Sequence, residues 1–588
     1  MRLPPSRLLV AGTAAGIVLA ASASVPAAAA APVTITPAAT AAAAKAATTS
    51  AAEKRRVDRL KTPKLDWYKC YQVAQCATVK VPLDYDNPGG AKTEIALLRI
   101  KAKDQKRKIG SLFVNPGGPG GSATSFALAA PYFLSESVLE RFDVVGVDPR
   151  GVGASANVKC FKSVKEQTRV FNGMNVAFPY TKAEKAKYIK SAQAFGKGCS
   201  TTGKPISGAM STAEVARDME LMRRAVGDKK LTYLGFSYGT ALGQYYANMF
   251  PDRFRAIVAD GNIDPRQWVG SGKGAGQILD ARMRSSDGAY KALVEIFKRC
   301  DQAGAEFCPF SAGNPARNYA AITAKLKAKP LVIRDEFGTY KVTYADFVGA
   351  TLSMLYSDYA GENVMQLAAD ISALQNGGAA AAPAKAAVLK RIKAAKSVGY
   401  DFPYDNSFEA QSAVICTDGN HPKKASSWPA KTAARDKAAP YFGRAWGWID
   451  VQCASSTWTV RDEDSYRGPF NRRTAKPVLL VGNYWDPATN YRASVSSSRL
   501  LPNSRLLASN NWGHTAYGTG VCATNAIDRY LLTGKLPAKG TVCRDARQPF
   551  REKLPADTDA KVLSATGKQL PPVVAPRPSS ILTGGLVG

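Results

Sequence analysis

The chain has 588 residues, 45% hydrophobic and 21% charged, which is typical of a globular protein and unlike a disordered or fibrous one. Its formal net charge is +33, but no helix-turn-helix, RNA-binding or finger pattern accompanies the basic residues, so nucleic acid is not an expected partner. A basic surface that keeps an exported protein soluble, or holds it loosely near an anionic cell wall, accounts for this charge.

The N-terminus has the order of a signal peptide. Two arginines precede an apolar stretch over residues 8–21, and small residues follow it. We expect a signal peptide over 1–30 and a linker or propeptide over 31–55, because the Ala/Thr/Pro-rich composition there cannot bury a core. An uncleaved membrane anchor is the alternative. No later segment approaches 18 uninterrupted apolar residues, so no membrane span is expected in the mature chain.

Ten cysteines agree with export into an oxidising environment. No C-x-x-C occurs and only two histidines are present, so we expect no metal site, and no cofactor either. Sequence alone does not fix the connectivity. Pairing of consecutive cysteines is the simplest hypothesis: Cys70–Cys76, Cys160–Cys199, Cys300–Cys308, Cys416–Cys453 and Cys522–Cys543.

Strands and helices alternate through the first part of the chain. The apolar patterns predict strands between 80 and 114 and at 142–148, a helix at 211–227, a strand at 231–235, a helix at 241–250 and a strand at 254–261. Such alternation indicates a mostly parallel sheet with helices on both faces. Helical segments then predominate before strand patterns return at 477–482 and 504–509.

One α/β core interrupted by a large helical lid insertion is the simplest organisation for this pattern. The expected divisions are a core N-terminal part at 56–265, a lid domain at 266–475, a core C-terminal part at 476–550 and a Pro-rich tail at 551–588. The tail composition predicts loose order.

A candidate nucleophile lies between the strand at 231–235 and the helix at 241–250. Gly235-Phe236-Ser237-Tyr238-Gly239 matches G-x-S-x-G in the strand–turn–helix context that marks a serine nucleophile. Glycine is required on both sides, because the flanking positions pass too close for a Cβ. We therefore expect an α/β-hydrolase fold with Ser237 as its nucleophile. A glycine-rich turn with a surface serine is the alternative.

A serine hydroxyl needs a base, and the chain has two histidines. His514 follows the last predicted strand in a glycine-flanked loop, whereas His421 lies in the predicted lid, ahead of the acid, which is the wrong chain order for this fold. Asp486 follows a predicted strand and a glycine. We expect Asp486 and His514 to complete a catalytic triad with Ser237, and His421 to be a surface loop residue.

Acyl transfer also needs donors for the developing oxyanion. Asn115-Pro116-Gly117-Gly118-Pro119-Gly120-Gly121 follows a predicted strand, and a loop so poor in side chains lets backbone N–H groups approach a substrate. We assign the oxyanion hole to the N–H groups of Gly118 and Tyr238. The glycines do not fit a phosphate-binding loop, since neither G-x-G-x-x-G nor a Walker lysine occurs.

Five elements stand in one order along the chain: NPGGPGG, DPRGVG, GFSYGT, a WDP acid loop and a GHT histidine loop. Together they resemble the prolyl aminopeptidase family of α/β-hydrolases, most closely its secreted actinobacterial tripeptidyl aminopeptidases, over residues 60–545. The smaller prolyl iminopeptidases have HGGPG where this chain has PGGPG, with Pro116 in the histidine position. The tripeptidyl branch tolerates this difference.

The resemblance implies a serine exopeptidase that releases short peptides, tripeptides in the branch it resembles, from substrates with free N-termini. Such an enzyme needs a cleft closed by the lid, with carboxylates that pair the substrate ammonium and reject blocked peptides. The lid offers Asp358, Glu362 and Asp418 as candidates, and the sequence does not choose among them.

Two other function classes remain open at this point. A secreted esterase or lipase would use the same triad, because both chemistries pass through an acyl-enzyme. A catalytically inactive binding or cell-wall protein on a hydrolase scaffold is the third reading, and the intact Ser, Asp and His set argues against it.

Overall fold

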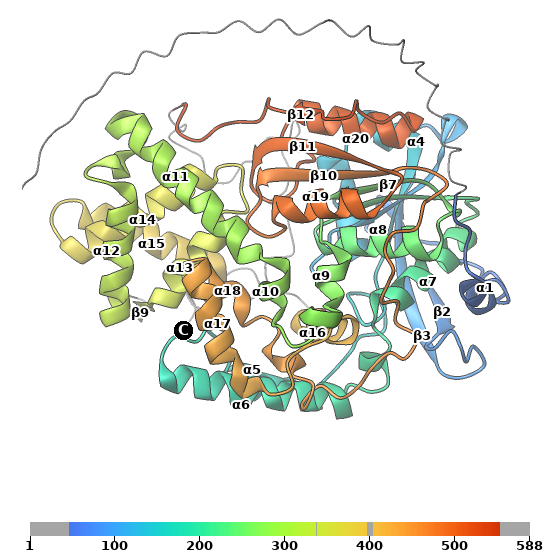
Figure 1. The fold of residues 1–588 in the computed structure, drawn as a ribbon, viewed down its shortest axis with the longest axis horizontal. Helices are drawn as coiled ribbons and strands as arrows, with labels where there is room; N and C mark the ends of the chain where they lie inside the picture. The colour runs from blue at the N-terminus through green and yellow to red at the C-terminus, as the bar shows by residue number, and fades with distance from the viewer. Residues whose placement is uncertain (1–45, 337, 397–403, 553–588) are drawn as a thin grey trace, which may run out of the picture. The chain divides into compact units, whose positions relative to one another are not determined.

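The computed structural model describes residues 46–336, 338–396 and 404–552 (Figure 1). The predicted signal peptide at 1–30 and nearly all of the predicted tail at 551–588 lie outside the described residues. Within the described ranges, no helix combines the length and the apolar composition needed to cross a membrane. All ten cysteines are described, and they form the five disulfides that consecutive pairing predicts.

A ten-stranded sheet forms the centre of the fold. Its strands are β1 Tyr68–Cys70, β2 Ala74–Pro82, β3 Lys92–Ile100, β4 Gly110–Asn115, β5 Phe142–Val147, β6 Leu231–Phe236, β7 Phe254–Asp260, β10 Val478–Trp485, β11 Ser504–Trp512 and β12 Val542–Cys543. They are ordered β1-β2-β3-β5-β4-β6-β7-β10-β11-β12. Neighbours from β5 to β12 are parallel, and β1 to β3 add an antiparallel edge. The predicted mostly parallel sheet is confirmed.

Helices cover both faces of this sheet. One face carries α2 Ala123–Leu128, α3 Ala130–Phe133, α4 Glu136–Arg141 and α20 Val521–Thr533, and the other carries α7 Thr212–Ala225, α8 Tyr238–Met249 and α19 Tyr491–Leu500. Alternate strand residues supply the two layers of the core: in β4, Leu112 and Val114 face one cluster and Phe113 the other. Burial on both faces explains why these strands read as continuous apolar runs.

The strand register brings the carboxyl ends of the central strands together. Asn115 at the end of β4 pairs with Gly235 of β6, Phe236 pairs with Asp260 of β7, and Asp260 pairs with Val481 of β10. The loops that follow these strands therefore meet at one edge of the sheet, where open α/β sheets bind ligands.

The segment between β7 and β10 is mainly helical, with helices α11 to α15 gathered at the left of Figure 1. It contains α9 Pro265–Val269, α10 Leu279–Met283, α11 Ser285–Phe307, α12 Pro315–Ala328, α13 Tyr344–Met354, α14 Ala360–Asn376, α15 Ala381–Lys396, α16 Ser407–Asp418, α17 Trp428–Ala438 and α18 Phe442–Gly447. An antiparallel hairpin of β8 Leu331–Asp335 and β9 Gly338–Val342 lies among these helices, which the helical patterns did not predict.

A second segment joins this insertion. Helices α5 Val164–Phe171 and α6 Lys182–Thr201 lie between β5 and α7, within the part predicted as core. The Cys160 N–H donates to Glu409 Oε1 of α16 at 3.1 Å, and the Thr459 N–H donates to Ser200 Oγ at 2.8 Å. Figure 1 shows α5 and α6 along the lower edge, beside α16 and α17. The helical region outside the two layers that cover the sheet is thus assembled from two separate stretches of chain, the insertion and the segment with α5 and α6.

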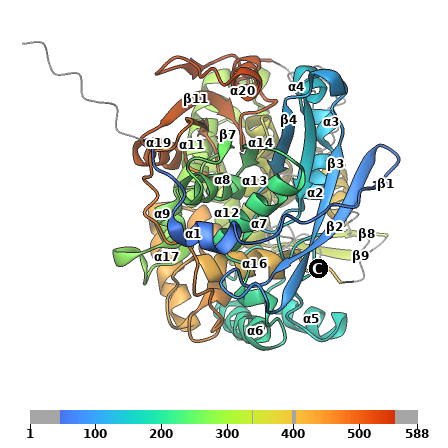
Figure 2. The ribbon, with the colours of Figure 1, turned by 90° about the vertical axis from the view of Figure 1, so that its right-hand side faces the viewer.

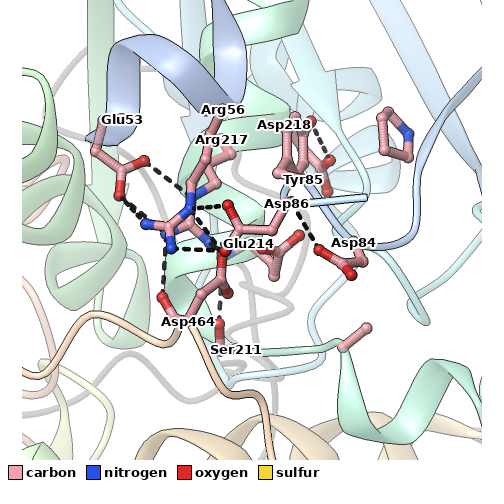
Figure 3. Close-up of polar contacts among 12 residues, drawn as sticks. Glu53, Arg56, Asp84, Tyr85, Asp86, Ser211, Glu214, Arg217, Asp218 and Asp464 are labelled. Atoms are coloured by element: carbon pink, nitrogen blue, oxygen red, sulfur yellow. Dashed lines mark hydrogen bonds and ion pairs between the residues drawn. The ribbon is translucent and has the colours of Figure 1, made fainter. Parts of the chain in front are cut away.

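Helix α1 (Ala51–Val57) anchors the first described residues to the core (Figures 2 and 3). Arg217 of α7 has a fully buried side chain, which pairs with Glu53 of α1 at 2.9 Å and with Asp464 at 2.7 Å. One guanidinium therefore joins α1, α7 and the stretch that returns from the insertion to β10. Residues 51–55, the end of the predicted linker or propeptide, thus form the first part of α1, which this contact holds.

Candidate active site

Ser237 occupies the turn between β6 and α8, and its backbone is in the left-handed region with φ +54°. It is the one residue from Leu231 to Phe250 that is not buried. A Cβ on Gly235 would lie 2.4 Å from the Gly239 carbonyl oxygen, and one on Gly239 would lie 2.9 Å from the Asn115 carbonyl oxygen. Both glycines are therefore required by close backbone contacts, and the turn is strained in the manner of an exposed nucleophile.

The glycine-rich loop after β4 rests against this turn. A Cβ on Gly117 would lie 2.5 Å from the Phe236 carbonyl oxygen and 2.8 Å from the Tyr238 nitrogen. Gly118 is partly exposed between two buried neighbours. Among the described residues, the N–H groups of Gly118 and Tyr238 have no hydrogen-bond partner. The structure thus places Gly117, the neighbour of the predicted oxyanion donor Gly118, against the turn that carries Ser237 and Tyr238.

Asp486 and His514 form a hydrogen-bonded pair. His514 Nδ1 lies 2.9 Å from Asp486 Oδ2 and 3.1 Å from Oδ1. The carboxylate is buried and also accepts from the N–H groups of Ala488 and Thr489 and from the Thr489 hydroxyl, at 2.7 to 2.8 Å. The His514 side chain is 6% exposed. A buried, fully bonded carboxylate behind the imidazole can orient that ring and stabilise its protonated form.

Asp260, at the end of β7, connects the Ser237 turn to the His514 loop. Its carbonyl oxygen accepts from the Ser237 N–H at 3.0 Å, and its buried carboxylate accepts from the N–H groups of Ala516 and Tyr517 at 2.8 to 3.0 Å. Burial raises the pKa of Asp260 to about 6, and the neighbouring Asp486 carboxylate adds to this rise. Sequence reasoning missed Asp260, although it ends a predicted strand just before a glycine, a signal close to the one used for Asp486.

The three predicted ammonium-binding carboxylates lie in different surroundings. Glu362 is paired with Arg547 at 2.7 Å and also accepts from the Phe550 N–H. Asp418 is buried and accepts from the Thr212 N–H, the Thr212 hydroxyl and Trp268 Nε1. Burial raises the pKa of Asp418 to about 6. The oxygens of Glu362 and Asp418 are thus taken up by other groups of the chain.

Asp358 differs from the other two. It follows the segment that contacts His514: the Tyr356 carbonyl accepts from the His514 N–H at 3.1 Å, and the Tyr356 ring meets the imidazole edge-on with centroids 5.2 Å apart. Its Oδ1 accepts from the Ser357 hydroxyl at 3.3 Å, and no lysine or arginine of the described chain forms an ion pair with it. Burial raises the pKa of Asp358, and the charge of Arg547, which pairs with Glu362, opposes part of that rise.

The expectation that His421 is a surface loop residue is wrong. Its side chain is buried, with Nδ1 3.0 Å from Asp450 Oδ2 and Nε2 3.0 Å from the Ile415 carbonyl oxygen. Asp450 also accepts from the Leu279 N–H and from Trp428 Nε1. His421 therefore joins helices of the insertion to one another. The polar loop DGNHPKK gave no sign of this burial.

Two groups of side chains in the described part of the chain have three potential metal-ligand atoms within 4.8 Å of one another. In the first, Cys522 and Cys543 are already joined by a disulfide. In the second, Glu214 and Asp464 pair with the buried Arg217 guanidinium at 2.5 and 2.7 Å (Figure 3). Arginine charge already neutralises these carboxylates, so neither donor set suits a metal ion.

Comparison with known proteins gives two family matches. Residues 110–278 match the "alpha/beta hydrolase fold" family, and residues 439–543 match the "TAP-like protein" family. The first match spans β4 to β7 and the second spans β10 to β12, so together they cover the sheet on both sides of the insertion.

Curated relatives align over 82% of this chain. A tripeptidyl aminopeptidase of Streptomyces lividans is 29% identical, and the alignment covers 87% of that protein. The serine protease Hip1 of Mycobacterium tuberculosis is also 29% identical, with 92% of it covered. A carboxylesterase B of the same organism is 30% identical, with 90% of it covered.

Proposed function

Because the chain belongs to the tripeptidyl aminopeptidase-like family of α/β-hydrolases and is a serine hydrolase, we propose that it is a secreted exopeptidase that releases short peptides, above all tripeptides, from free N-termini. The Asp486–His514 hydrogen bond, at the sheet edge that also presents the Ser237 turn, is the observation that carries this proposal. The five disulfides support export, since such bonds persist in oxidising compartments.

In the proposed mechanism, Ser237 attacks the carbonyl of the scissile bond while His514 accepts the hydroxyl proton. Asp486 orients the imidazole and stabilises its protonated form. The N–H groups of Gly118 and Tyr238 bind the oxyanion, and removal of one such donor costs about 3 kcal/mol in comparable sites. His514 then protonates the departing amine. Water hydrolyses the acyl-enzyme with His514 as base again.

Asp358 is the proposed partner of the substrate ammonium, because it is the candidate that lies beside the His514 segment and forms no salt bridge within the described chain. We do not propose Glu362 or Asp418 for this role, because their carboxylate oxygens already pair with Arg547 and accept from Trp268, respectively. A partly buried carboxylate that forms no ion pair of its own gains a charge-assisted hydrogen bond from a free N-terminus and none from an acetylated one. The site would therefore select free N-termini.

Asp358→Asn is expected to lower kcat/KM for a free-amine tripeptide anilide about 30-fold, because loss of one partner of a desolvated charge pair costs about 2 kcal/mol. Most of the loss should appear in KM. Turnover of the N-acetylated anilide, already slow, should not fall. Asp66→Asn removes the same charge from a side chain that is 80% exposed, and serves as the matched control. Equal losses for both substrates would exclude Asp358 as the ammonium partner.

His421→Gln should leave kcat of the folded enzyme within about twofold of the parent, because His421 contacts Asp450 and Ile415 rather than the proposed triad. The free energy of unfolding should fall by about 1–3 kcal/mol, since buried hydrogen-bonding groups lose their partner. Steady-state kinetics and urea unfolding measure the two quantities separately. A loss of kcat in fully folded protein would contradict the assignment of His514 as the base.

Three chromogenic substrates test the proposed activity: a free-amine tripeptide anilide, its N-acetylated form and a short-chain ester. Preference for the free tripeptide is the expected result. The carboxylesterase among the relatives keeps ester hydrolysis as a second candidate function. Turnover of the ester alone, or equal cleavage of the blocked peptide, would favour that second candidate.

A further inference from the structure

Helix α16 rests on the glycine-rich loop with its first turn. A Cβ at Gly120 would lie 2.9 Å from the Gln411 nitrogen and 3.0 Å from the Ser407 carbonyl oxygen. Gly120 also has φ +91°, a conformation that favours glycine. The backbone of α16 is therefore in direct contact with the loop, two residues after the proposed oxyanion donor Gly118.

Asp418, the last residue of the same helix, is linked through Thr212 to the side chain of Tyr238, whose N–H is the other proposed donor. Asp418 Oδ2 accepts from the Thr212 hydroxyl, which in turn lies 2.5 Å from the Tyr238 hydroxyl. Asp418 Oδ1 also accepts from the Thr212 N–H at 2.7 Å, and Oδ2 accepts from Trp268 Nε1 at 2.8 Å. The Trp268 ring packs against that of Tyr238, with centroids 5.5 Å apart.

The donor and acceptor of each hydrogen bond in this Tyr238–Thr212–Asp418 series follow from the hydrogens available. A threonine hydroxyl has one hydrogen, and here it is directed to the carboxylate, so the Tyr238 hydroxyl must donate to Thr212. Tyr238, Thr212 and Asp418 are all at most 2% exposed. Buried hydrogen bonds of this kind are costly to break and hold side chains in one orientation. These hydrogen bonds therefore fix the orientation of the ring of Tyr238, which is the first residue of α8.

From these contacts we infer that Asp418 and Thr212 are positioning residues that fix Tyr238, so that α16 braces both donors of the oxyanion hole. This inference rests on the proposed function, because it takes the N–H groups of Gly118 and Tyr238 as the donors. It reassigns Asp418, which the sequence offered as an ammonium ligand. It also makes the oxyanion hole depend on the insertion, since α16 belongs to it.

Thr212→Val is the central variant, because it replaces the hydroxyl with a methyl group of similar size and keeps the backbone bond to Asp418. Loss of an oxyanion donor costs about 10²–10³ in kcat, and a misplaced donor should cost about 10- to 100-fold. KM should change less than about threefold, because the ground-state substrate gains little from the hole. Binding of a peptide aldehyde, whose Ser237 adduct places an oxyanion there, should weaken by the same factor as kcat/KM.

Three further variants separate positioning from general packing. Thr212→Ser keeps the hydroxyl and should restore most of the rate. Tyr238→Phe should match Thr212→Val, and the double variant should be no slower than either single one, since the two hydroxyls act as a unit. Thr351→Val is the matched control: its hydroxyl is also buried and lies 2.9 Å from a tyrosine hydroxyl, that of Tyr319, elsewhere in the insertion.

Labelling of the parent enzyme with a fluorophosphonate distinguishes the two proposals. Labelling at Ser237, together with parental kcat and aldehyde affinity in Thr212→Val, would overturn the positioning role and leave the proposed function standing. Failure of the parent enzyme to label at Ser237 would overturn the proposed function, and the positioning role with it. Equal losses of kcat in Thr351→Val would also overturn the positioning role, because the effect of Thr212→Val would then be general destabilisation.

Discussion

Ser237→Ala is expected to lower kcat by about 10⁶, because loss of the nucleophile removes the acyl-enzyme route and leaves binding and the oxyanion hole alone. The fold should not change. Ser237 is partly exposed, and alanine meets the same backbone restriction at φ +54°. Kinetics with the free-amine tripeptide anilide and thermal unfolding measure the two effects.

Ser498→Ala is the matched control for this variant, since in the described part of the chain its hydroxyl donates to the Val495 carbonyl within α19 and to no other group. It should retain the parental rate. Ser237→Ala protein that still turns over within about 100-fold of the parent would remove Ser237 from the mechanism, because loss of a nucleophile costs far more.

Arg217→Met is expected to lower the free energy of unfolding by about 3–5 kcal/mol, since it leaves buried carboxylates without their cation. The Arg217 side chain is fully buried and pairs with Glu53, Glu214 and Asp464 (Figure 3). Burial already raises the pKa of Glu214 well above its usual value, and two arginine charges oppose that rise. Urea unfolding followed by tryptophan fluorescence measures the loss.

Arg169→Met provides the comparison, because that side chain is 77% exposed and lies 4.0 Å from Glu166. Its effect should stay below about 0.5 kcal/mol. A loss of less than about 1 kcal/mol for Arg217→Met would mean that helix α1 is not anchored by this guanidinium. Proteolysis should also cut α1 faster in the Arg217 variant, because the same side chain holds that helix.

Local patterns were enough to predict the sheet and the Ser237 turn. Each central strand is an apolar run buried on both faces, and close backbone contacts require both glycines beside Ser237. The scarcity of histidine reduced the choice of base to two residues, and the strand–glycine–loop pattern indicated Asp486. These features depend on residues near one another in the chain, which sequence reports well.

Contacts between residues far apart in the sequence determine the surroundings of Asp260, His421 and Asp418, which local patterns did not predict. Asp260 carries the same strand-end signal as Asp486, and its partners Ala516 and Tyr517 are some 256 residues away along the chain. His421 lies in a polar loop that packing of the insertion buries. In the sequence, Asp418 looks like any acidic residue at a helix end, and only the folded structure shows that Thr212 and Trp268 donate to it. No local pattern reports which distant donor will satisfy a given carboxylate.

Mass spectrometry of the products from an unlabelled peptide of about ten residues tests the central claim most directly. The free-amine peptide should yield its first three residues as a tripeptide, followed by the next three, while the N-acetylated peptide stays intact and Ser237→Ala protein releases nothing. Internal cleavage, or equal cleavage of the acetylated peptide by the parent enzyme, would contradict an exopeptidase that reads a free N-terminus.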